Sequence, residues 1–308
     1  MGLKISRHYP IVHQFDEDSI KDANPYYIVF ATGIQGWRPT MEDAHIVQLT
    51  AVGDDQASAF FALFDGHGGP DIAQFAAANI QARVLQHPKL YENTCYALRH
   101  ALLEIDKEAY ALGNELYFQS FSLSQDSENP EKYHLIGCTA VLTLIKDKRL
   151  YCANIADSRC IASVSGHAIQ MSIEHKPTDD VELQRITNHK GNMKGYVENG
   201  RINGNLAVPR ALGDFYYKNN MEGPPFDRIV CAWSDITVRT LTDDWEFLIM
   251  ACDGIWDVMT NSEVVEFVRN RFAQHLDARR VGVLRNFATN VPLSRLKNVL
   301  TKSSKPWI

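Results

Sequence analysis

The chain has 308 residues, of which 45% are hydrophobic, and its net charge is −6. This length and composition suffice for one large domain with a substantial core. No apolar run approaches the length of a membrane-spanning helix, which excludes that class of protein. The six cysteines form no Cys-x-x-Cys pair and no secretory signal is present, so we expect reduced thiols in a cytosolic protein.

The charge is distributed unevenly along the chain. Residues 269–308 carry nine Lys or Arg and one acid, so that segment is +8 and residues 1–268 are −14. The basic residues are not interleaved with an aromatic platform, which argues against a nucleic-acid-binding protein. We predict one domain over 25–272, an N-terminal segment over 1–24 and a basic tail over 273–308.

The first half of the chain predicts three strands followed by two helices. The strand segments are rich in β-branched and aromatic residues and are interrupted by Gly or Asp, and they span 27–35, 44–52 and 57–64. The helix segments span 71–86 and 92–112. The second helix places its apolar residues on one stripe at helical spacing, which we interpret as a core-facing surface.

The second half predicts more strands and two more helices. Strand segments span 138–146, 150–155, 160–164, 229–238 and 246–252, with a helix over 179–189 and a Gly- and Asn-rich flap over 192–205. Thr260 and Glu263 form a capping box, so the last helix begins there. Strands and helices in separate groups, rather than in alternation, predict an α+β fold.

Two Asp-Gly motifs each follow a short apolar run. Residues 60–64 precede Asp65, and residues 245–251 lie just before Asp253. An apolar run of this length predicts a buried strand, and the glycine after each aspartate lets the chain turn sharply. One Asp-Gly is usually a plain turn, but two carboxylates at the rim of a core favour a site for Mg²⁺ or Mn²⁺.

A third motif adds a cation to these acids. Arg38 lies shortly before Glu42 and Asp43, one predicted strand upstream of Asp65. A guanidinium binds a phosphate through two parallel hydrogen bonds. A metal site beside such an arginine points to phosphate esters as substrates.

Six motifs in this order resemble the metal-dependent protein phosphatase 2C family, over residues 27 to 272. They are Gly36-Trp37-Arg38 with Met41-Glu42-Asp43-Ala44-His45, Asp65-Gly66-His67-Gly68-Gly69, Ala156-Asp157-Ser158-Arg159, Arg201-Ile202-Asn203-Gly204 with Leu206-Ala207-Val208, Arg210-Ala211-Leu212-Gly213-Asp214-Phe215, and Ala251-Cys252-Asp253-Gly254-Ile255-Trp256-Asp257. The resemblance implies two packed antiparallel β-sheets flanked by α-helices. It also implies hydrolysis of phosphoserine and phosphothreonine in proteins by a water activated at a two-metal centre.

The resemblance implies a ligand set for two ions of Mg²⁺ or Mn²⁺. Asp65 and Asp253 match the carboxylates that bridge the two ions. Glu42 matches a ligand of one ion, and the carbonyl of Gly66 matches another. Two cations held this closely lower the pKa of a shared water toward neutrality.

Three further acids match family positions around that centre. Asp157 resembles the ligand of a weaker third ion, and Asp214 resembles an acid that supports the same region. Asp43 is expected to hold Arg38 or a metal-bound water without touching an ion. From the residues alone, Asp157 and Asp214 fit turn caps equally well.

Two residues are predicted to act on the substrate. Arg38 resembles the family's phosphate clamp, and a surface ion pair to Glu42 or Asp43 is the alternative. His67 resembles the general acid that protonates the departing Ser or Thr oxygen, and a structural histidine is the alternative. Two other matched stretches are interpreted as scaffold, Gly137-Cys138-Thr139-Ala140 and Glu174-His175-Lys176-Pro177.

The match fails before the family's usual C-terminus. Members normally close with an Asp-Asn pair that opens a last strand. Here the only aspartate after residue 260 is Asp277, and no β-branched run follows it. One metal would then lose a carboxylate, and one sheet would lose its final strand. Two alternatives to an active protein phosphatase stay open: a pseudophosphatase that binds phosphoproteins, and a two-metal hydrolase of small phosphate esters.

The two ends of the chain predict a peripheral membrane contact for a mainly cytoplasmic enzyme. Met1-Gly2-Leu3-Lys4-Ile5-Ser6 fits the N-myristoylation pattern, with an ordinary disordered N-terminus as the alternative. One acyl chain needs a second signal for stable attachment, which the +8 segment would supply. Attachment of this kind should weaken as salt rises.

Overall fold

A computed structural model describes residues 20–35, 38–123, 134–191, 193–218 and 223–273. Gly2, Asp277 and nearly all of the predicted basic tail lie outside these residues. The predictions for myristoylation, for the tail and for the missing last strand therefore stay predictions.

The larger of the two main sheets has five antiparallel strands in the order β14-β8-β7-β4-β3. Their bounds are β3 (Ala44–Leu49), β4 (Ala59–Phe64), β7 (Ala140–Lys146), β8 (Arg149–Ile155) and β14 (Asp235–Thr240). Every residue of β7 is buried, because other layers cover both faces of the sheet. This explains why the strand appears in the sequence as a continuous apolar run.

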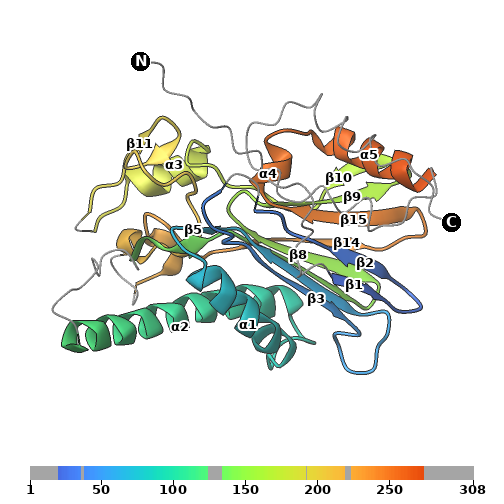
Figure 1. The fold of residues 1–308 in the computed structure, drawn as a ribbon, viewed down its shortest axis with the longest axis horizontal. Coiled ribbons are helices and arrows are strands. Elements are labelled where there is room, and N and C mark those ends of the chain that lie inside the picture. The colour runs from blue at the N-terminus through green and yellow to red at the C-terminus, as the bar shows by residue number, and fades with distance from the viewer. Residues whose placement is uncertain (1–19, 36–37, 124–133, 192, 219–222, 274–308) are drawn as a thin grey trace, which may run out of the picture.

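The smaller sheet packs face to face against the larger one. Its order is β10-β9-β15, with bounds β9 (Arg159–Val164), β10 (His167–Gln170) and β15 (Trp245–Ala251). Leu63 and Val141 of the larger sheet share a buried cluster with Ala162 of the smaller one. Figure 1 shows the two sheets as stacked layers, and a hairpin of β1 (Ile20–Ala23) and β2 (Ile28–Ala31) beside them.

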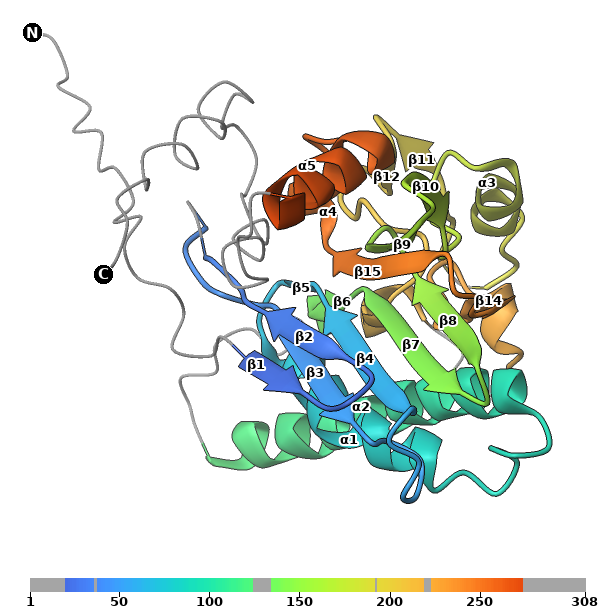
Figure 2. The ribbon, with the colours of Figure 1, turned by 90° about the vertical axis from the view of Figure 1, so that its right-hand side faces the viewer.

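Helices cover the outer faces of both sheets (Figure 2). The long helices α1 (Asp71–Leu85) and α2 (Thr94–Leu123) pack on the larger sheet, where Phe60 and Leu142 lie fully buried beneath them. The helices α4 (Asp253–Trp256) and α5 (Asn261–Ala273) pack on the smaller sheet. The predicted α+β sandwich with flanking helices is confirmed.

The capping box predicted before α5 is present. The backbone N–H of Thr260 donates to Glu263 Oε2 at 2.9 Å, and the N–H of Glu263 donates to Thr260 Oγ1 at 3.3 Å. These two bonds satisfy amide groups that the first helical turn leaves without partners.

Several short elements complete the described fold. A three-stranded sheet has the order β13-β6-β5, formed by β5 (Gly66–His67), β6 (Gly137–Cys138) and β13 (Leu212–Gly213). The predicted flap contains the hairpin of β11 (Val197–Glu198) and β12 (Arg201–Ile202), and α3 (Asp180–Thr187) precedes it. Two 3₁₀ helices are η2 (Phe215–Tyr217) and η3 (Pro225–Asp227).

Several element boundaries differ from the prediction. Helix α2 continues to Leu123 instead of ending at 112, and β1 lies inside the predicted N-terminal segment, where it pairs with β2. The strand predicted over 229–238 begins only at Asp235. The carbonyl of Ile229 instead accepts a hydrogen bond from the buried Arg185 at 2.6 Å. Val230 and Ala232 are buried but belong to no named strand.

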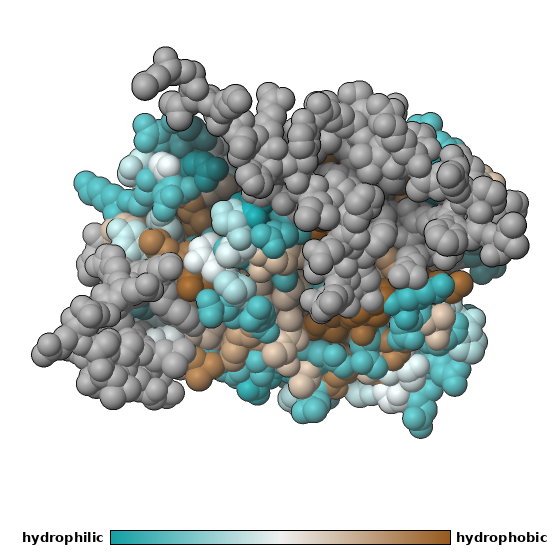
Figure 3. Space-filling model, in the orientation of Figure 1, coloured by the Kyte–Doolittle hydropathy of each residue, from teal (hydrophilic) through white to brown (hydrophobic). Residues whose placement is uncertain are grey.

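The space between the two sheets opens to one side in an apolar cavity of about 390 Å³, lined by residues of β2, β15 and α5. Within the described residues β15 pairs only with β9, so its other edge is where a further strand would extend the sheet. Figure 3 shows brown, apolar surface at the level of β2 and β15.

The described residues contain no disulfide and no membrane-spanning helix. All six cysteines are free thiols and five of them are buried. Among the helices that the structure describes, none is long and apolar enough to cross a membrane.

The predicted membrane contact is tested by fractionating cells that express wild type, Gly2→Ala, or a chain ending at Arg280. At low salt we expect a membrane fraction for wild type alone, because acyl chain and basic tail act together. Raising the salt should release it by screening the tail. Wholly soluble wild type at low salt would contradict the prediction.

Candidate metal centre

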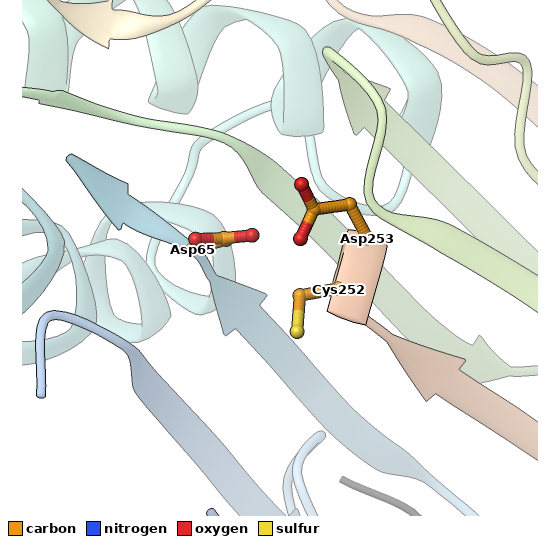
Figure 4. Close-up of side chains that lie close together, drawn as sticks. All are labelled: Asp65, Cys252 and Asp253. Carbon is orange, nitrogen blue, oxygen red and sulfur yellow. The ribbon is translucent and has the colours of Figure 1, made fainter. Parts of the chain in front are cut away.

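The two predicted metal-bridging acids come from opposite sheets and meet at one end of the sandwich. Asp65 follows the last residue of β4, and Asp253 is the first residue of α4, just after β15. Ligand atoms of Asp65, Cys252 and Asp253 all lie within 4.8 Å of one another. Figure 4 shows the three side chains gathered where the two strands end. Because each acid follows a strand of one of the two packed sheets, the packing of the sheets fixes their separation.

Thr139, at the start of β7, holds the backbone at Asp65. The N–H of Asp65 donates to Thr139 Oγ1 at 3.2 Å, and the N–H of Thr139 donates to the carbonyl of Asp65 at 2.9 Å. The same hydroxyl lies 2.7 Å from Ser158 Oγ, next to Asp157. The stretch around Thr139, interpreted from sequence as scaffold, therefore ties two predicted ligand segments together.

Gly66 is required here by close contact. A Cβ at this position would lie 2.2 Å from the backbone oxygen of Glu42, a distance that no side chain tolerates. The glycine thus lets the segment that carries Glu42 approach the Asp65 turn. The Glu42 carboxylate accepts a hydrogen bond from Thr40 Oγ1 at 2.7 Å.

One small cavity of about 150 Å³ brings most of the predicted site together. Its lining includes Arg38, Glu42, Asp43, Asp65, Gly66, Cys252 and Asp253. Arg38 is exposed. Its guanidinium therefore remains accessible to a ligand that reaches the acids.

The acids of the cavity repel one another strongly. Burial, with the charges of Asp43 and Asp253, raises the pKa of Asp65 well above its usual value. Burial and the charge of Asp157 likewise raise the pKa of Asp253. Arg38 lowers both values but does not cancel the effect. Negative charge is thus concentrated beyond what the protein's own cations compensate.

This donor set fits a hard divalent cation. Carboxylate and carbonyl oxygens are the ligands that Mg²⁺ and Mn²⁺ prefer, and a cation would relieve the repulsion between Asp65 and Asp253. Burial and the charge of Asp65 raise the pKa of the Cys252 thiol well above its usual value. The thiol therefore stays protonated beside the oxygens, and we do not assign Cys252 as a ligand of such an ion.

Asp157 has a cationic partner in the structure. Its carboxylate accepts a hydrogen bond from Lys176 Nζ at 2.8 Å. Its negative charge contributes to the raised pKa of both Asp65 and Asp253. Because of this ion pair, Asp157 does more than cap a turn. The ion pair also gives Lys176, predicted to be scaffold, a place at the edge of the site.

Asp214 lies against His67, a contact that the sequence analysis did not predict. The Asp214 carboxylate is buried and lies 2.7 Å from His67 Nε2. Burial lowers the pKa of His67, but the charge and hydrogen bond of Asp214, together with the charges of two other acids, outweigh it and the net shift is upward. The pair keeps more of the ring in its protonated form near neutral pH.

Gly137 separates the strands that carry this pair. In the sheet β13-β6-β5, Gly137 of β6 is the register partner of both His67 and Gly213. A Cβ on Gly137 would lie 2.2 Å from Asp214 Oδ2 and 2.8 Å from His67 Nε2. Nothing but glycine leaves room for the contact.

Sequence reasoning gave no role in the site to four residues: Gly137, Thr139, Lys176 and Cys252. All four lie in stretches that match family positions, but those of Gly137, Thr139 and Lys176 were interpreted as scaffold. These three act through contacts between segments far apart in the sequence.

The comparisons with known proteins agree on one family. The family model for protein phosphatase 2C matches residues 28–290. A probable protein phosphatase 2C of Caenorhabditis elegans is 41% identical over 266 residues, covering 86% of this chain and 69% of that protein. Protein phosphatase 2C homolog 2 of Schizosaccharomyces pombe is 39% identical over 241 residues, covering 77% of this chain and 60% of that protein.

A solved structure shares the fold. The serine-threonine phosphatase 2C from Toxoplasma gondii superposes with a TM-score of 0.66 at 20% identity, covering 86% of this chain and 91% of that one. The family model covers most of this chain, and the nematode relative is 41% identical to it over 86% of its length. The chain therefore belongs to the protein phosphatase 2C family.

Proposed function

We propose that this chain hydrolyses phosphoserine and phosphothreonine in proteins with the help of two Mg²⁺ or Mn²⁺ ions and a weaker third. Membership of a generally metal-dependent phosphatase family supports the proposal. The observation that carries it is the convergence of Asp65 and Asp253, from two sheets, in one cavity with Arg38. The chain spans 69% and 60% of the nematode and yeast relatives, so the activity is proposed for the domain that it contains.

In this proposal the acids of the cavity hold the ions. Asp65 and Asp253 would each contribute a carboxylate to both ions, and Glu42 and the carbonyl of Gly66 would supply further oxygens. The ions, when bound, supply an activated water and neutralise charge on the phosphate. Asp157 with Lys176 lies where a third, weaker ion would be held.

His67 supplies the proton that the leaving oxygen needs. Asp214 holds one ring nitrogen at 2.7 Å, which leaves the other nitrogen to donate toward the Ser or Thr oxygen. Burial lowers the pKa of His67, but the charge and hydrogen bond of Asp214 and the charges of Asp157 and Glu42 together raise it, which keeps that proton available near neutral pH.

Arg38 binds the phosphate of the substrate, so Arg38→Ala should raise KM for a phosphopeptide by about tenfold or more and change kcat less. A clamp on the ground-state phosphate acts mainly by binding. Steady-state kinetics on one phosphopeptide measures both constants. Arg201→Ala, which removes another exposed arginine whose side chain bonds Asn205, is the matched control. An unchanged KM in Arg38→Ala would make Arg38 structural.

The proposed activity is tested on the full chain with a phosphoserine peptide during a Mn²⁺ titration. Turnover that saturates with Mn²⁺ and disappears with chelator supports it. Peptide binding without turnover would favour the pseudophosphatase. Turnover of small phosphate esters but not of phosphopeptides or phosphoproteins would favour the small-ester hydrolase.

A further inference from the structure

A buried ion pair lies behind the proposed proton donor. Lys218 Nζ donates to Asp106 Oδ1 at 2.6 Å, and both side chains are almost fully buried, 0% and 1% exposed. Asp106 lies on α2, whereas Lys218 follows η2. Removing two charges from water is costly, so a buried pair is weak evidence for stability and calls for another explanation.

Both members of the pair also bind the backbone of one short segment. Asp106 Oδ1 accepts a hydrogen bond from the N–H of Gly213 at 2.9 Å, and Lys218 Nζ donates to the carbonyl of Ala211 at 2.9 Å. Residues 211–218 are thus fastened to α2 at two points. Asp214 lies between the residues that make these contacts.

The fastened segment holds Asp214 in an unfavourable backbone conformation. Asp214 has φ of 51°, in the left-handed region that non-glycine residues rarely adopt. Its N–H donates to the carbonyl of Ile136 at 2.8 Å, and its carbonyl accepts from the N–H of Tyr217 at 3.0 Å. Such a conformation persists only where surrounding contacts enforce it.

The contact between Asp214 and His67 leaves little room for displacement. The two side chains are 2.7 Å apart, and Gly137 fits beneath them only because it lacks a side chain. A small shift of the Asp214 backbone would therefore lengthen the bond to His67 or push Asp214 into β6.

We propose that the Asp106–Lys218 pair is a positioning element for the proton donor, which fastens the turn of Asp214 to α2 and through Asp214 orients His67. This inference rests on the proposed function, in which His67 protonates the leaving oxygen. Asp106 touches neither substrate nor ions and acts only through the turn.

The test compares two substrates in the full chain at saturating Mn²⁺: a phosphoserine peptide, which needs a proton on its leaving oxygen, and an aryl phosphate, which does not. Asp106→Asn keeps an oxygen that accepts from Gly213 but loses the charge that holds Lys218. Since small misplacements of catalytic groups are costly, we expect kcat/KM to fall about tenfold for the peptide and to stay within about twofold for the aryl phosphate.

The matched control is Glu182→Gln, which removes the charge from another buried ion pair, formed with Arg210 at 2.6 Å. Loss of Glu182 should lower Tm and leave the ratio of the two activities at the wild-type value. If Asp106→Asn likewise lowers Tm without changing the ratio, the pair is only structural and the proposal is overturned.

Two further measurements cover the remaining outcomes. In a His67→Gln background, Asp106→Asn should cause no further loss on the peptide, and an undiminished loss would overturn the proposal.

Should Asp106→Asn not fold, Lys218→Met and the double variant Asp106→Asn/Lys218→Met replace it under the same criterion. The ¹⁵N resonances of the His67 ring report its hydrogen bond without any turnover, and they should move in these variants but not in Glu182→Gln. A wild type that hydrolyses neither substrate refutes the proposed function, while the ring resonances still test the positioning.

Discussion

Replacing Asp65 by Asn should lower kcat for a phosphopeptide by about 10³-fold or more in Mn²⁺, because metal assistance is worth several kcal/mol. A carboxylate shared by two cations is lost from the centre of the cavity, so bound metal should also fall below two ions per chain. Kinetics and metal analysis of the purified protein measure the two effects separately.

The same substitution should not destabilise the metal-free protein. Burial and the charges of Asp43 and Asp253 raise the pKa of Asp65, so the folded state holds this proton more tightly than the unfolded chain does. The stability contributed by protonated Asp65 is therefore lost as pH rises from the unfolded value through the folded pKa. At neutral pH we expect the Tm of metal-free Asp65→Asn to equal or exceed that of wild type.

The control for Asp65→Asn is Asp243→Asn, which removes an exposed carboxylate in the turn before β15. Asp243→Asn should keep near-wild-type turnover and metal content. Near-wild-type turnover of Asp65→Asn in Mn²⁺ would refute the two-metal assignment.

Replacing His67 by Gln should lower kcat/KM for a phosphoserine peptide by about 10²- to 10⁴-fold, the usual contribution of general acid catalysis. An aryl phosphate should lose far less, because an aryl oxide departs without being protonated. The ratio of the two losses measures the role of His67 as a proton donor, since a general loss of structure would affect both substrates.

The chain offers a matched control in a second histidine–aspartate pair. His175 Nε2 lies 2.9 Å from Asp235 Oδ2, and the side chain of His175 is buried. His175→Gln should reduce both activities equally if it reduces them at all. Equal losses on both substrates in His67→Gln would remove His67 from the role of general acid.

Local sequence patterns were sufficient where a segment carries its own signal. The continuous apolar runs of β4 and β7 identified buried strands, whereas the run of β15 identified a strand that is only half-buried. The Asp-Gly turns after β4 and β15 identified the two central acids. The capping box at Thr260 marked the start of α5, because its hydrogen bonds join residues three apart. The resemblance of ordered motifs then supplied the roles.

Sequence patterns failed where the signal is too short. The strands β5, β6 and β13 have two residues each, and no periodicity appears in so few positions. These strands nevertheless place His67 and Asp214 on either side of Gly137. The contact between Asp214 and His67 was therefore not predicted from the sequence.

The sequence by itself determined the class of this protein: an α+β phosphatase fold with an arginine and a set of carboxylates, because those signals are local and ordered along the chain. Only the tertiary structure decided which charges face each other. Asp214 meets His67 across 147 positions, Lys218 meets Asp106 across 112, and Lys176 meets Asp157 across 19. Such pairings depend on how the sheets and α2 pack. The partner of a carboxylate is set by which folded segments lie close together, and neighbouring residues in the sequence do not encode that proximity.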